Sequence, residues 1–481
     1  MSYPSRSNGD RPTGSAVPFL IGFLLIGGLA GADASAGSPS SAAIREAQSA
    51  FDKRQYPQAL SLLESVTKGE GAPVEARRLK LRTLLQLGKP RDAVTEYERI
   101  ERTLGGDDLP ALRELSLGMI LPLLTDMREQ MRGAAYTALK EAESEDTLRY
   151  FEDGLTDGSG LIRALAVEGL GKLKVGRKSP RLRKAVKDQA ALVRATALRV
   201  LGRSGDPAVM DLVGKSVNDE QPMVHVAALG AQVLLGRRGA LKQLEAGVEA
   251  LNPEEKGSAL RWLAELEGKD AMPFLTRALR DPQPSVRGAA AKALAEVKGA
   301  ESVALLLSLL DDPVAPVRGA AATSLGTFDG GDATEGLKKI LRDPHPMVRA
   351  SGIGSLLEQG MLTDELTAAV QGLLTHADPG LRGAVARAMG KAQGEAVRPA
   401  VETLQLLVHD ALPRPRIMAA RSLGQVEVEP GAVPGRLAML KKVLRDQDEA
   451  VRATAGGAIL HVLSLHQPTA PLAPRGGSRA R

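Results

Sequence analysis

The chain has 481 residues, no cysteine, and 63 Lys and Arg against 57 Asp and Glu, which gives a formal net charge of +6. The lack of cysteine excludes disulfides, thiolate zinc sites, cysteine nucleophiles and a cysteine-linked lipid anchor, and is compatible with an oxidising compartment. Arg475, Arg479 and Arg481 supply half of the net charge, and there are only one Trp, five Tyr and six Phe. Near-neutral charge and few aromatic platforms disfavour nucleic-acid binding.

Residues 1–34 are predicted to be a signal peptide or an N-terminal anchor. An apolar run at 17–30 follows a polar stretch that carries Arg6 and Arg11, and two Ala-x-Ala cleavage sequences lie between Ala32 and Ala36. Because the run is short for a bilayer span, we favour cleavage over retention. Both outcomes would export the remainder, so we expect a periplasmic or secreted protein, less favourably one anchored by this segment.

A Ser/Ala/Gly linker is expected at 35–42, followed by helical repeats at 43–106. Related positions recur there after 34 residues: Ala50, Tyr56, Ala59 and Leu63 are followed by Leu84, Pro90, Ala93 and Tyr97. This helix-turn-helix period resembles the tetratricopeptide repeat, with turns near 54–60 and 87–94. Two units are too few to stand alone, so we expect an extension that packs on the first helices of the following array.

From about 107 to 465 a shorter unit recurs, most completely at 281–294. Its anchor is a basic residue that returns in steps of 31 and later of slightly more residues: Arg132, Arg163, Arg194, His225, Lys256, Arg287, Arg318, Arg349, Arg382, Arg416 and Arg452. Self-similarity at a fixed period of this size indicates a repeat architecture. The segment 466–481 is rich in Pro, Gly and Arg and is predicted to be a disordered tail.

Each unit is predicted to contain two helices separated by a tight turn. An acid stands six residues before most anchors, a small residue three after them, and a large apolar residue seven after them, as in Asp281, Ala290 and Leu294 around Arg287. Apolar positions at −1, +3 and +7 form one stripe of an amphipathic helix, and Asp-Pro breaks the chain before it. Such helix pairs must stack, so we expect an all-α fold, one long α-solenoid superhelix of about eleven antiparallel helix pairs.

The pattern Asp-x-x-x-x-Val-Arg-x-x-Ala-x-x-Ala-Leu-Gly resembles the HEAT-like repeat family, in particular the short bacterial variety related to phycobilisome-lyase repeats. The resemblance covers about 107–465 and implies a solenoid that serves mostly as a binding scaffold. The 31-residue step is shorter than the roughly 40 to 47 residues typical of HEAT and armadillo units, which implies short helices and tight turns.

The acid and anchor columns are expected to form a structural ladder, because a residue repeated in every unit cannot mark one active site. An acid in the turn can cap the next helix and can pair with an arginine of its own or an adjacent unit. The members of this ladder include Asp157, Arg163, Asp188, Arg194, Asp281, Arg287, Asp312, Arg318, Asp343 and Arg349.

Two features are candidate partner-binding surfaces. The ladder fails where the anchors are His225 and Lys256, the acid column holds Ala250, and the single tryptophan, Trp262, lies nearby; this is either a specialised patch or repeat decay. Five residues after the anchor comes a column with five basic members: Arg199, Arg261, Lys292, Arg387 and Arg421. If the second helices line the concave side, they form a basic row for an acidic protein segment or anionic polymer; otherwise they are a solvated helix face.

No catalytic residue, metal site or cofactor is predicted. The six histidines form no His-x-x-x-His or His-Glu pair, whereas the iron-dependent hydroxylases built on HEAT-like repeats use His-Glu pairs, and no phosphate loop or nucleophile elbow is present. We therefore expect a non-catalytic, exported scaffold or adaptor that binds a protein partner along its concave face. Two alternatives stay open: a lyase-type enzyme or accessory acting on a cofactor-bearing protein, and a polyanion or nucleic-acid binder.

Overall fold

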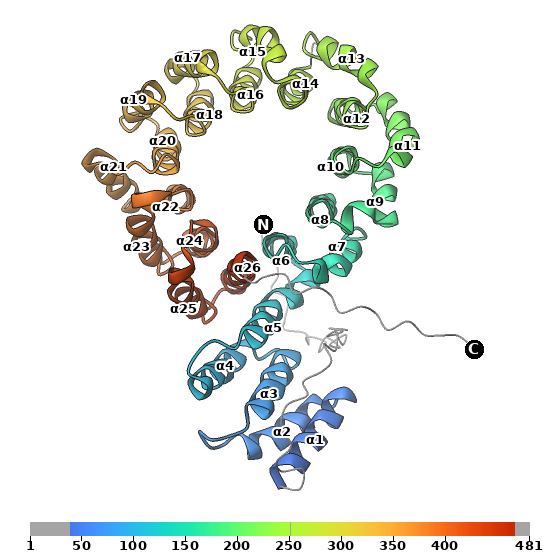
Figure 1. Cartoon of the computed structure of the whole chain (residues 1–481), viewed down its shortest axis with the longest axis vertical. Coiled ribbons are helices and arrows are strands. Elements are labelled where there is room, and N and C mark those ends of the chain that lie inside the picture. The colour runs from blue at the N-terminus through green and yellow to red at the C-terminus, as the bar shows by residue number, and fades with distance from the viewer. Residues whose placement is uncertain (1–38, 251, 467–481) are drawn as a thin grey trace, which may run out of the picture.

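A computed structural model describes residues 39–250 and 252–466, and within these ranges the secondary structure is helical throughout (Figure 1). The all-α solenoid expected from the repeats is confirmed. The predicted signal peptide at 1–34 and all of the predicted tail except His466 lie outside the described residues. In the described part of the chain no helix is long and apolar enough to span a bilayer.

The N-terminal extension consists of two helix pairs. They are α1 (Pro39–Asp52), α2 (Tyr56–Val66), α3 (Val74–Gln86) and α4 (Pro90–Leu104). Helix α1 begins inside the stretch expected to be a linker, because proline is tolerated in a first helical turn and the alanines after it favour helix. Helices α3 and α4 pack on α5, and Tyr97 and Ile100 share a core with Leu112 and Leu115.

The array that follows alternates short first helices with longer second helices. The first helices are α5 (Leu109–Ile120), α7 (Leu148–Gly154), α9 (Pro180–Lys184), α11 (Met210–Lys215), α13 (Leu241–Gly247), α15 (Met272–Ala278), α17 (Ala300–Ser308), α19 (Gly331–Ile340), α21 (Asp364–Leu374), α23 (Val397–Leu407) and α25 (Val433–Val443). The second helices are α6 (Glu129–Glu141), α8 (Gly160–Lys172), α10 (Ala191–Gly202), α12 (Pro222–Leu234), α14 (Pro253–Glu267), α16 (Pro284–Leu294), α18 (Ala315–Leu325), α20 (Pro346–Glu358), α22 (Pro379–Met389), α24 (Pro413–Gln425) and α26 (Glu449–His466). Proline at the start of many second helices sets the tight turn, since it fits a first turn and cannot continue the helix before it.

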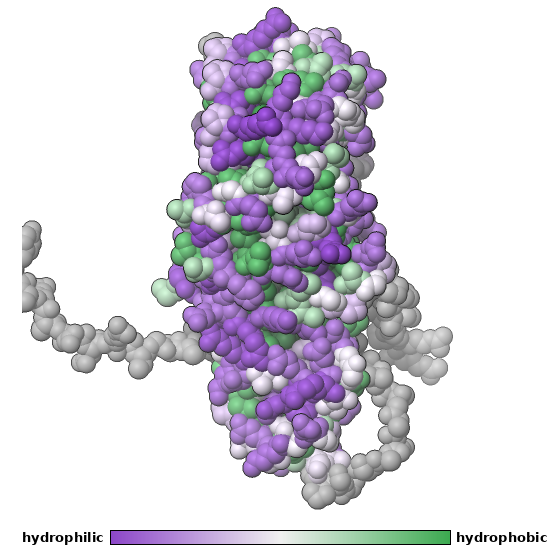
Figure 2. All heavy atoms as spheres, turned by 90° about the vertical axis from the view of Figure 1, so that its left-hand side faces the viewer, coloured by the Kyte–Doolittle hydropathy of each residue, from purple (hydrophilic) through white to green (hydrophobic). Residues whose placement is uncertain are grey.

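The array closes on itself, a feature that the repeat pattern does not predict. Helix α26 packs against both α5 and α6, and Figure 1 shows a ring in which the second helices form the inner layer and the first helices the outer layer. The extension projects from the place where the two ends of the array meet. In the edge-on view of Figure 2, the face that is shown is narrow and predominantly hydrophilic, with scattered hydrophobic areas.

Small residues explain the curvature. The glycine eight residues after an anchor faces a small residue on the next second helix, and a Cβ added to it would lie 2.6 to 2.7 Å from that neighbour in four steps: Gly202 on Ala231, Gly326 on Ser355, Gly390 on Ser422, and Gly424 on Ala458. The inner helices therefore approach closely, while apolar side chains separate the outer ones. A small rotation at every step sets the curvature of a solenoid, and here it accumulates to a full circle.

The seam between the last and first repeats has contacts of its own. A Cβ on Gly457 would lie 2.8 Å from Cα of Ala138, so the two helices meet almost backbone to backbone. Ion pairs surround this contact: Arg421–Glu141 at 2.9 Å, Arg128–Glu449 at 2.7 Å, Lys441–Glu101 at 2.7 Å and Arg445–Glu98 at 2.7 Å. Because Glu98 and Glu101 belong to α4, the extension contacts the last repeat as well as the first.

Candidate functional site

The anchor and acid columns form a ladder between successive repeats. In one rung, Arg163 donates from Nε and Nη2 to the two carboxylate oxygens of Asp188, both at 2.7 Å, and from Nη1 to the carbonyl of Asp157 at 2.8 Å. Two-pronged pairs of this kind are stronger and more directional than single hydrogen bonds. The rungs are Arg132–Asp157, Arg163–Asp188, Arg194–Asp219, Lys256–Asp281, Arg287–Asp312, Arg318–Asp343, Arg382–Asp410 and Arg416–Asp446.

The acid also orders the turn before its own helix. Oδ1 of Asp188 accepts the N–H of Ala190 at 2.8 Å, and Ala190 is the residue at the N-cap of α10. The expected capping therefore differs in position: Asp188 lies two residues before the N-cap and binds the N–H of the N-cap residue, not the N–H groups of the first helical turn. Burial opposes ionisation of Asp188, but the hydrogen bonds from Arg163 and Ala190 outweigh it and lower its pKa. The ladder is therefore a structural device made of ionised groups.

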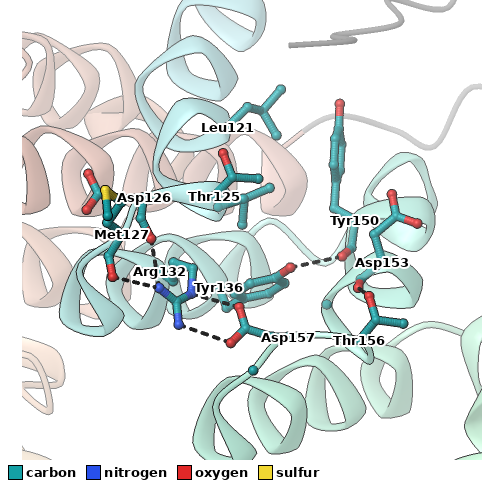
Figure 3. Close-up of a pocket in the computed structure, with 13 residues that line it drawn as sticks. Leu121, Thr125, Asp126, Met127, Arg132, Tyr136, Tyr150, Asp153, Thr156 and Asp157 are labelled. Carbon is teal, nitrogen blue, oxygen red and sulfur yellow. Dashed lines mark hydrogen bonds and ion pairs between the residues drawn. The ribbon is translucent and has the colours of Figure 1, made fainter. Parts of the chain in front are cut away.

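The first rung borders a cavity of about 570 Å³ between α6 and α7. Figure 3 shows Arg132 bonded to Asp157, and Tyr136 pointing at the backbone of Tyr150, whose carbonyl accepts from the Tyr136 hydroxyl at 3.3 Å. The other carboxylates of the lining are also paired, Asp126 with Arg128 and Asp153 with Arg181. The charged groups here already satisfy one another, so this cavity is not the candidate site.

The ladder is interrupted at two places. His225 places Nδ1 against the carbonyl of Val217 and has no acid opposite it, whereas Lys256 retains its rung to Asp281 at 2.9 Å. Arg349 donates only to backbone carbonyls, among them that of Asp343 at 2.8 Å, because the next acid position is His376. Nδ1 of His376 accepts the N–H of Asp378 at 3.0 Å, so it reproduces the turn function of the acid without its charge.

The basic column lies on the second helices, which form the inner layer of the ring (Figure 1). Arg199, Arg261, Lys292 and Arg387 are exposed and make no ion pair within residues 39–250 and 252–466. Arg421 differs, because it is half-buried and pairs with Glu141 across the seam. Four of the five predicted residues therefore remain available on the inner face.

Two of these residues share a cavity of about 290 Å³. It is bounded by α10, α12 and α14, and its lining consists of Leu192, Ala195, Arg199, Arg203, Met223, Ala227, Ser258, Arg261, Trp262 and Glu265. We call this the α10–α14 cavity. Gly230 leaves room for the Trp262 ring, because a Cβ at this position would lie 2.2 Å from the ring. The indole therefore packs over α12, and Trp262 is only 6% exposed. Arg203 reaches past α12 to pair with Glu265 at 2.8 Å.

The two arginines are held in equivalent ways. Nη2 of Arg199 donates to the Thr196 hydroxyl and Nη2 of Arg261 to the Ser258 hydroxyl, each at 3.0 Å. The surrounding protein partly desolvates the guanidinium of Arg261 and so lowers its pKa. The positive charge of Arg199 lowers this pKa further. Two like charges in one cavity repel each other, so an anion bound between them would relieve an unfavourable interaction.

The structure brings together only part of the predicted partner-binding set. Arg199, Arg261 and Trp262 meet in the α10–α14 cavity, whereas His225 and Lys256 face the turns of the ladder. Lys292 does not line this cavity. Arg387 lies near Arg414 and Arg421; partial desolvation of its exposed guanidinium by the surrounding protein lowers its pKa most, and the charges of these two arginines lower it further.

Sequence reasoning missed the pair Arg203 and Glu265, which joins helices two repeats apart and belongs to no column. The available signal for a recess in the inner face was Gly230, which stands in the same column between Arg199 and Arg261.

Similarity to known proteins supports the repeat assignment. Residues 241–326 match the family model described as HEAT repeats, and no curated protein matches the sequence. In the described residues no group of three or more His, Asp or Glu side chains is arranged to hold a metal ion.

Solved structures with similar folds include human deoxyhypusine hydroxylase, with 20% identity, 51% of this chain and 96% of that chain covered, and a TM-score of 0.30. The complex of CpcE and CpcF of phycocyanin lyase from Nostoc sp. PCC7120 is 22% identical, with 47% of this chain and 92% of that chain covered and a TM-score of 0.32. A Kap121p mutant is 12% identical, with 85% of this chain and 54% of that chain covered and a TM-score of 0.34. Similarities at this level carry no argument about activity or partners. The family match identifies HEAT repeats at residues 241–326, and the stacked helix pairs continue on both sides of this segment.

Proposed function

We propose that the protein is a non-catalytic scaffold that holds an acidic segment of a partner protein against the inner face of its ring. The observation that carries this proposal is the set of exposed, unpaired basic side chains on the second helices, namely Arg199, Arg261, Lys292 and Arg387. A concave surface with charge of one sign attracts segments of the opposite sign and raises their association rate.

The architecture favours binding over chemistry. The ladder ties most second helices to the following turn, and the seam ties the last repeat to the first, so the inner surface is organised before any partner arrives. A preorganised surface loses less conformational freedom on binding. The function is then to fix a partner segment in place, with the extension at the seam available as a second attachment surface.

Export remains part of the proposal. It rests on the apolar run and the Ala-x-Ala sequences of residues 1–34, which precede the described helices. The partner is accordingly expected outside the cytoplasm. Fractionation of cells, with N-terminal sequencing of the mature protein, would test this part independently of binding.

The scaffold proposal is tested by affinity capture from crosslinked cells. The test variant changes Arg199, Arg261, Lys292 and Arg387 to Glu. The control variant changes four exposed lysines of the outer layer to Glu, so that the change in net charge is the same; they are Lys184, Lys187, Lys242 and Lys339. Circular dichroism would establish that both variants keep the helical content of the wild type.

We expect one protein to be captured by the wild type and by the control variant and to be lost from the inner-face variant. Crosslinks from that protein should map to second helices. Equal capture by all three forms, or equal loss from both variants, would refute binding at the inner face.

A further inference from the structure

We propose that the α10–α14 cavity is a carboxylate site that takes one acidic group of the partner together with an adjacent apolar side chain. This inference rests on the proposed function and names the chemistry that its inner face recognises.

The charge of the cavity requires an anion. Arg199 and Arg261 each have one hydroxyl partner, which leaves most of their N–H donors free for a ligand. The third arginine, Arg203, is already neutralised by Glu265. A guanidinium matches a carboxylate with two parallel hydrogen bonds, so two of them, on the helices that flank α12, can share one carboxylate bound in the cavity.

The remaining walls are apolar. Leu192 is 40% exposed although it is a large hydrophobic residue, and it stands near Met223, the indole of Trp262, and the small side chains Ala195 and Ala227. Covering such a surface with an apolar side chain removes it from water at a gain proportional to its area. The combination of paired arginines and an apolar wall suits an acidic group flanked by a residue such as leucine.

Size and charge limit the occupant further. A volume of about 290 Å³ lies just below the range for small-molecule sites, roughly 300 to 1,000 Å³, and accommodates one or two side chains. The ion pair between Arg203 and Glu265 leaves Arg199 and Arg261 as the uncompensated charges of the lining. The carboxylate can come from an Asp or Glu side chain or from the C-terminus of a chain, and both sources share this chemistry.

Trp262 provides a direct readout, because it is the only tryptophan of the chain and lines the cavity. The full chain would be titrated with capped synthetic peptides of Gly and Ser that contain Leu-Asp-Leu, Leu-Asn-Leu or Leu-phosphoserine-Leu at the centre. A fourth peptide would end in Leu-Leu with a free carboxylate, and a fifth would be its amide. Trp262 fluorescence and calorimetry would be measured for each.

The matched variants are Arg199→Gln and Arg261→Gln inside the cavity and Lys339→Gln at an exposed position of the outer layer. We expect the Leu-Asp-Leu peptide or the free-carboxylate peptide to bind and to change Trp262 fluorescence, while the Asn and amide forms do not. Either cavity variant should weaken binding about tenfold or more, the loss expected for a charged hydrogen bond, and Lys339→Gln should leave it unchanged. Which of the two carboxylate peptides binds identifies the source.

Equal binding of the Asn or amide forms, tighter binding of the phosphoserine peptide, equal loss in all three variants, or no binding at millimolar peptide would each overturn the carboxylate site. These failures are separate from failure of the scaffold proposal. A partner captured through the inner face by a chain that ignores the peptides would uphold the scaffold and reject this cavity as its anchor.

Discussion

Gly457 of α26 packs directly against Ala138 of α6 and so joins the last repeat of the array to the first. In four other close steps around the ring, the glycine eight residues after an anchor meets a small residue six after the next anchor. At the seam, Ala138 keeps the receiving position, but the glycine that meets it stands five residues after Arg452. The closing contact therefore has its own register and depends on its own small residue.

The first prediction concerns ring closure. Gly457→Ala would place a methyl group 2.8 Å from both the backbone and the side chain of Ala138, so α26 must move away from α6. We expect faster amide exchange in α26 and a larger radius of gyration by small-angle X-ray scattering, because the seam loosens while the other repeats stay folded.

Gly288→Ala is the matched control for this change. Gly288 lies in α16, and a methyl group there meets no atom within 4 Å, so the substitution should stabilise the helix by about 1 kcal/mol without changing the ring. If Gly457→Ala behaves like this control, the seam does not hold the ring closed.

The repeats were predictable from the sequence because their signals are local. Columns around anchors such as Arg287 and Leu294 define one helix and one turn at a time, and each of these contacts spans about one repeat. Closure was not predictable in this way, since it depends on a small angle summed over the whole array and on one contact between Gly457 and Ala138. The cavity was predictable only in part. Arg199 and Arg261 share a column of the repeat, but the ion pair between Arg203 and Glu265 spans an intervening helix, and a repeat pattern does not show such contacts.

The second prediction compares a complete rung with an incomplete one. Arg318→Ala removes both hydrogen bonds to Asp343, a buried acid, and should lower the free energy of unfolding by about 2 to 3 kcal/mol. Arg349→Ala removes only bonds to backbone carbonyls and should cost about 1 kcal/mol. Urea unfolding of the two variants measures the difference, and equal losses would show that the acid contributes nothing to the rung.

A third prediction repairs the incomplete rung. His376→Asp keeps an acceptor for the N–H of Asp378 and offers Arg349 a carboxylate at the position where Asp410 serves Arg382. We expect a gain of about 1 kcal/mol in the free energy of unfolding. His376→Asn, which supplies the acceptor without the charge, is the control, and the gain should vanish when Arg349 is also changed to Ala. A gain that survives in that double variant would contradict the new ion pair.

The fourth prediction is the pH dependence of stability. Hydrogen bonds from Arg287 lower the pKa of Asp312, and those from Arg194 lower the pKa of Asp219; Arg128 lowers the pKa of Asp126 to about 2. A depressed folded-state pKa stabilises the protein above the unfolded value of about 3.9 and loses that stabilisation as the pH falls through the folded value. The free energy of unfolding should thus fall steeply below about pH 4.

Removing one rung should reduce this dependence. In Arg287→Ala, Asp312 loses the hydrogen bonds that contribute most to lowering its pKa and keeps the N–H of Val314, so its contribution to the slope below about pH 4 should shrink. Urea titrations of wild type and variant at several pH values measure the two slopes, with Lys339→Ala as an exposed control that should match the wild type. Parallel curves for wild type and Arg287→Ala would mean that the rung is not an ion pair in solution.

The last prediction tests the recess beneath Trp262 with two glycines of the same column. A methyl group on Gly230 would lie 2.2 Å from the indole, whereas one on Gly354 would lie 3.4 Å from Ala388, an ordinary contact. Gly230→Ala must displace Trp262 toward the cavity, so we expect a red-shifted tryptophan emission, weaker peptide binding and a lower unfolding midpoint. Gly354→Ala should be neutral or stabilise the protein by up to about 1 kcal/mol, since alanine is the better helix former. An unshifted emission in Gly230→Ala would show that the indole does not rest on α12, and the α10–α14 cavity would lose the residue that forms its floor.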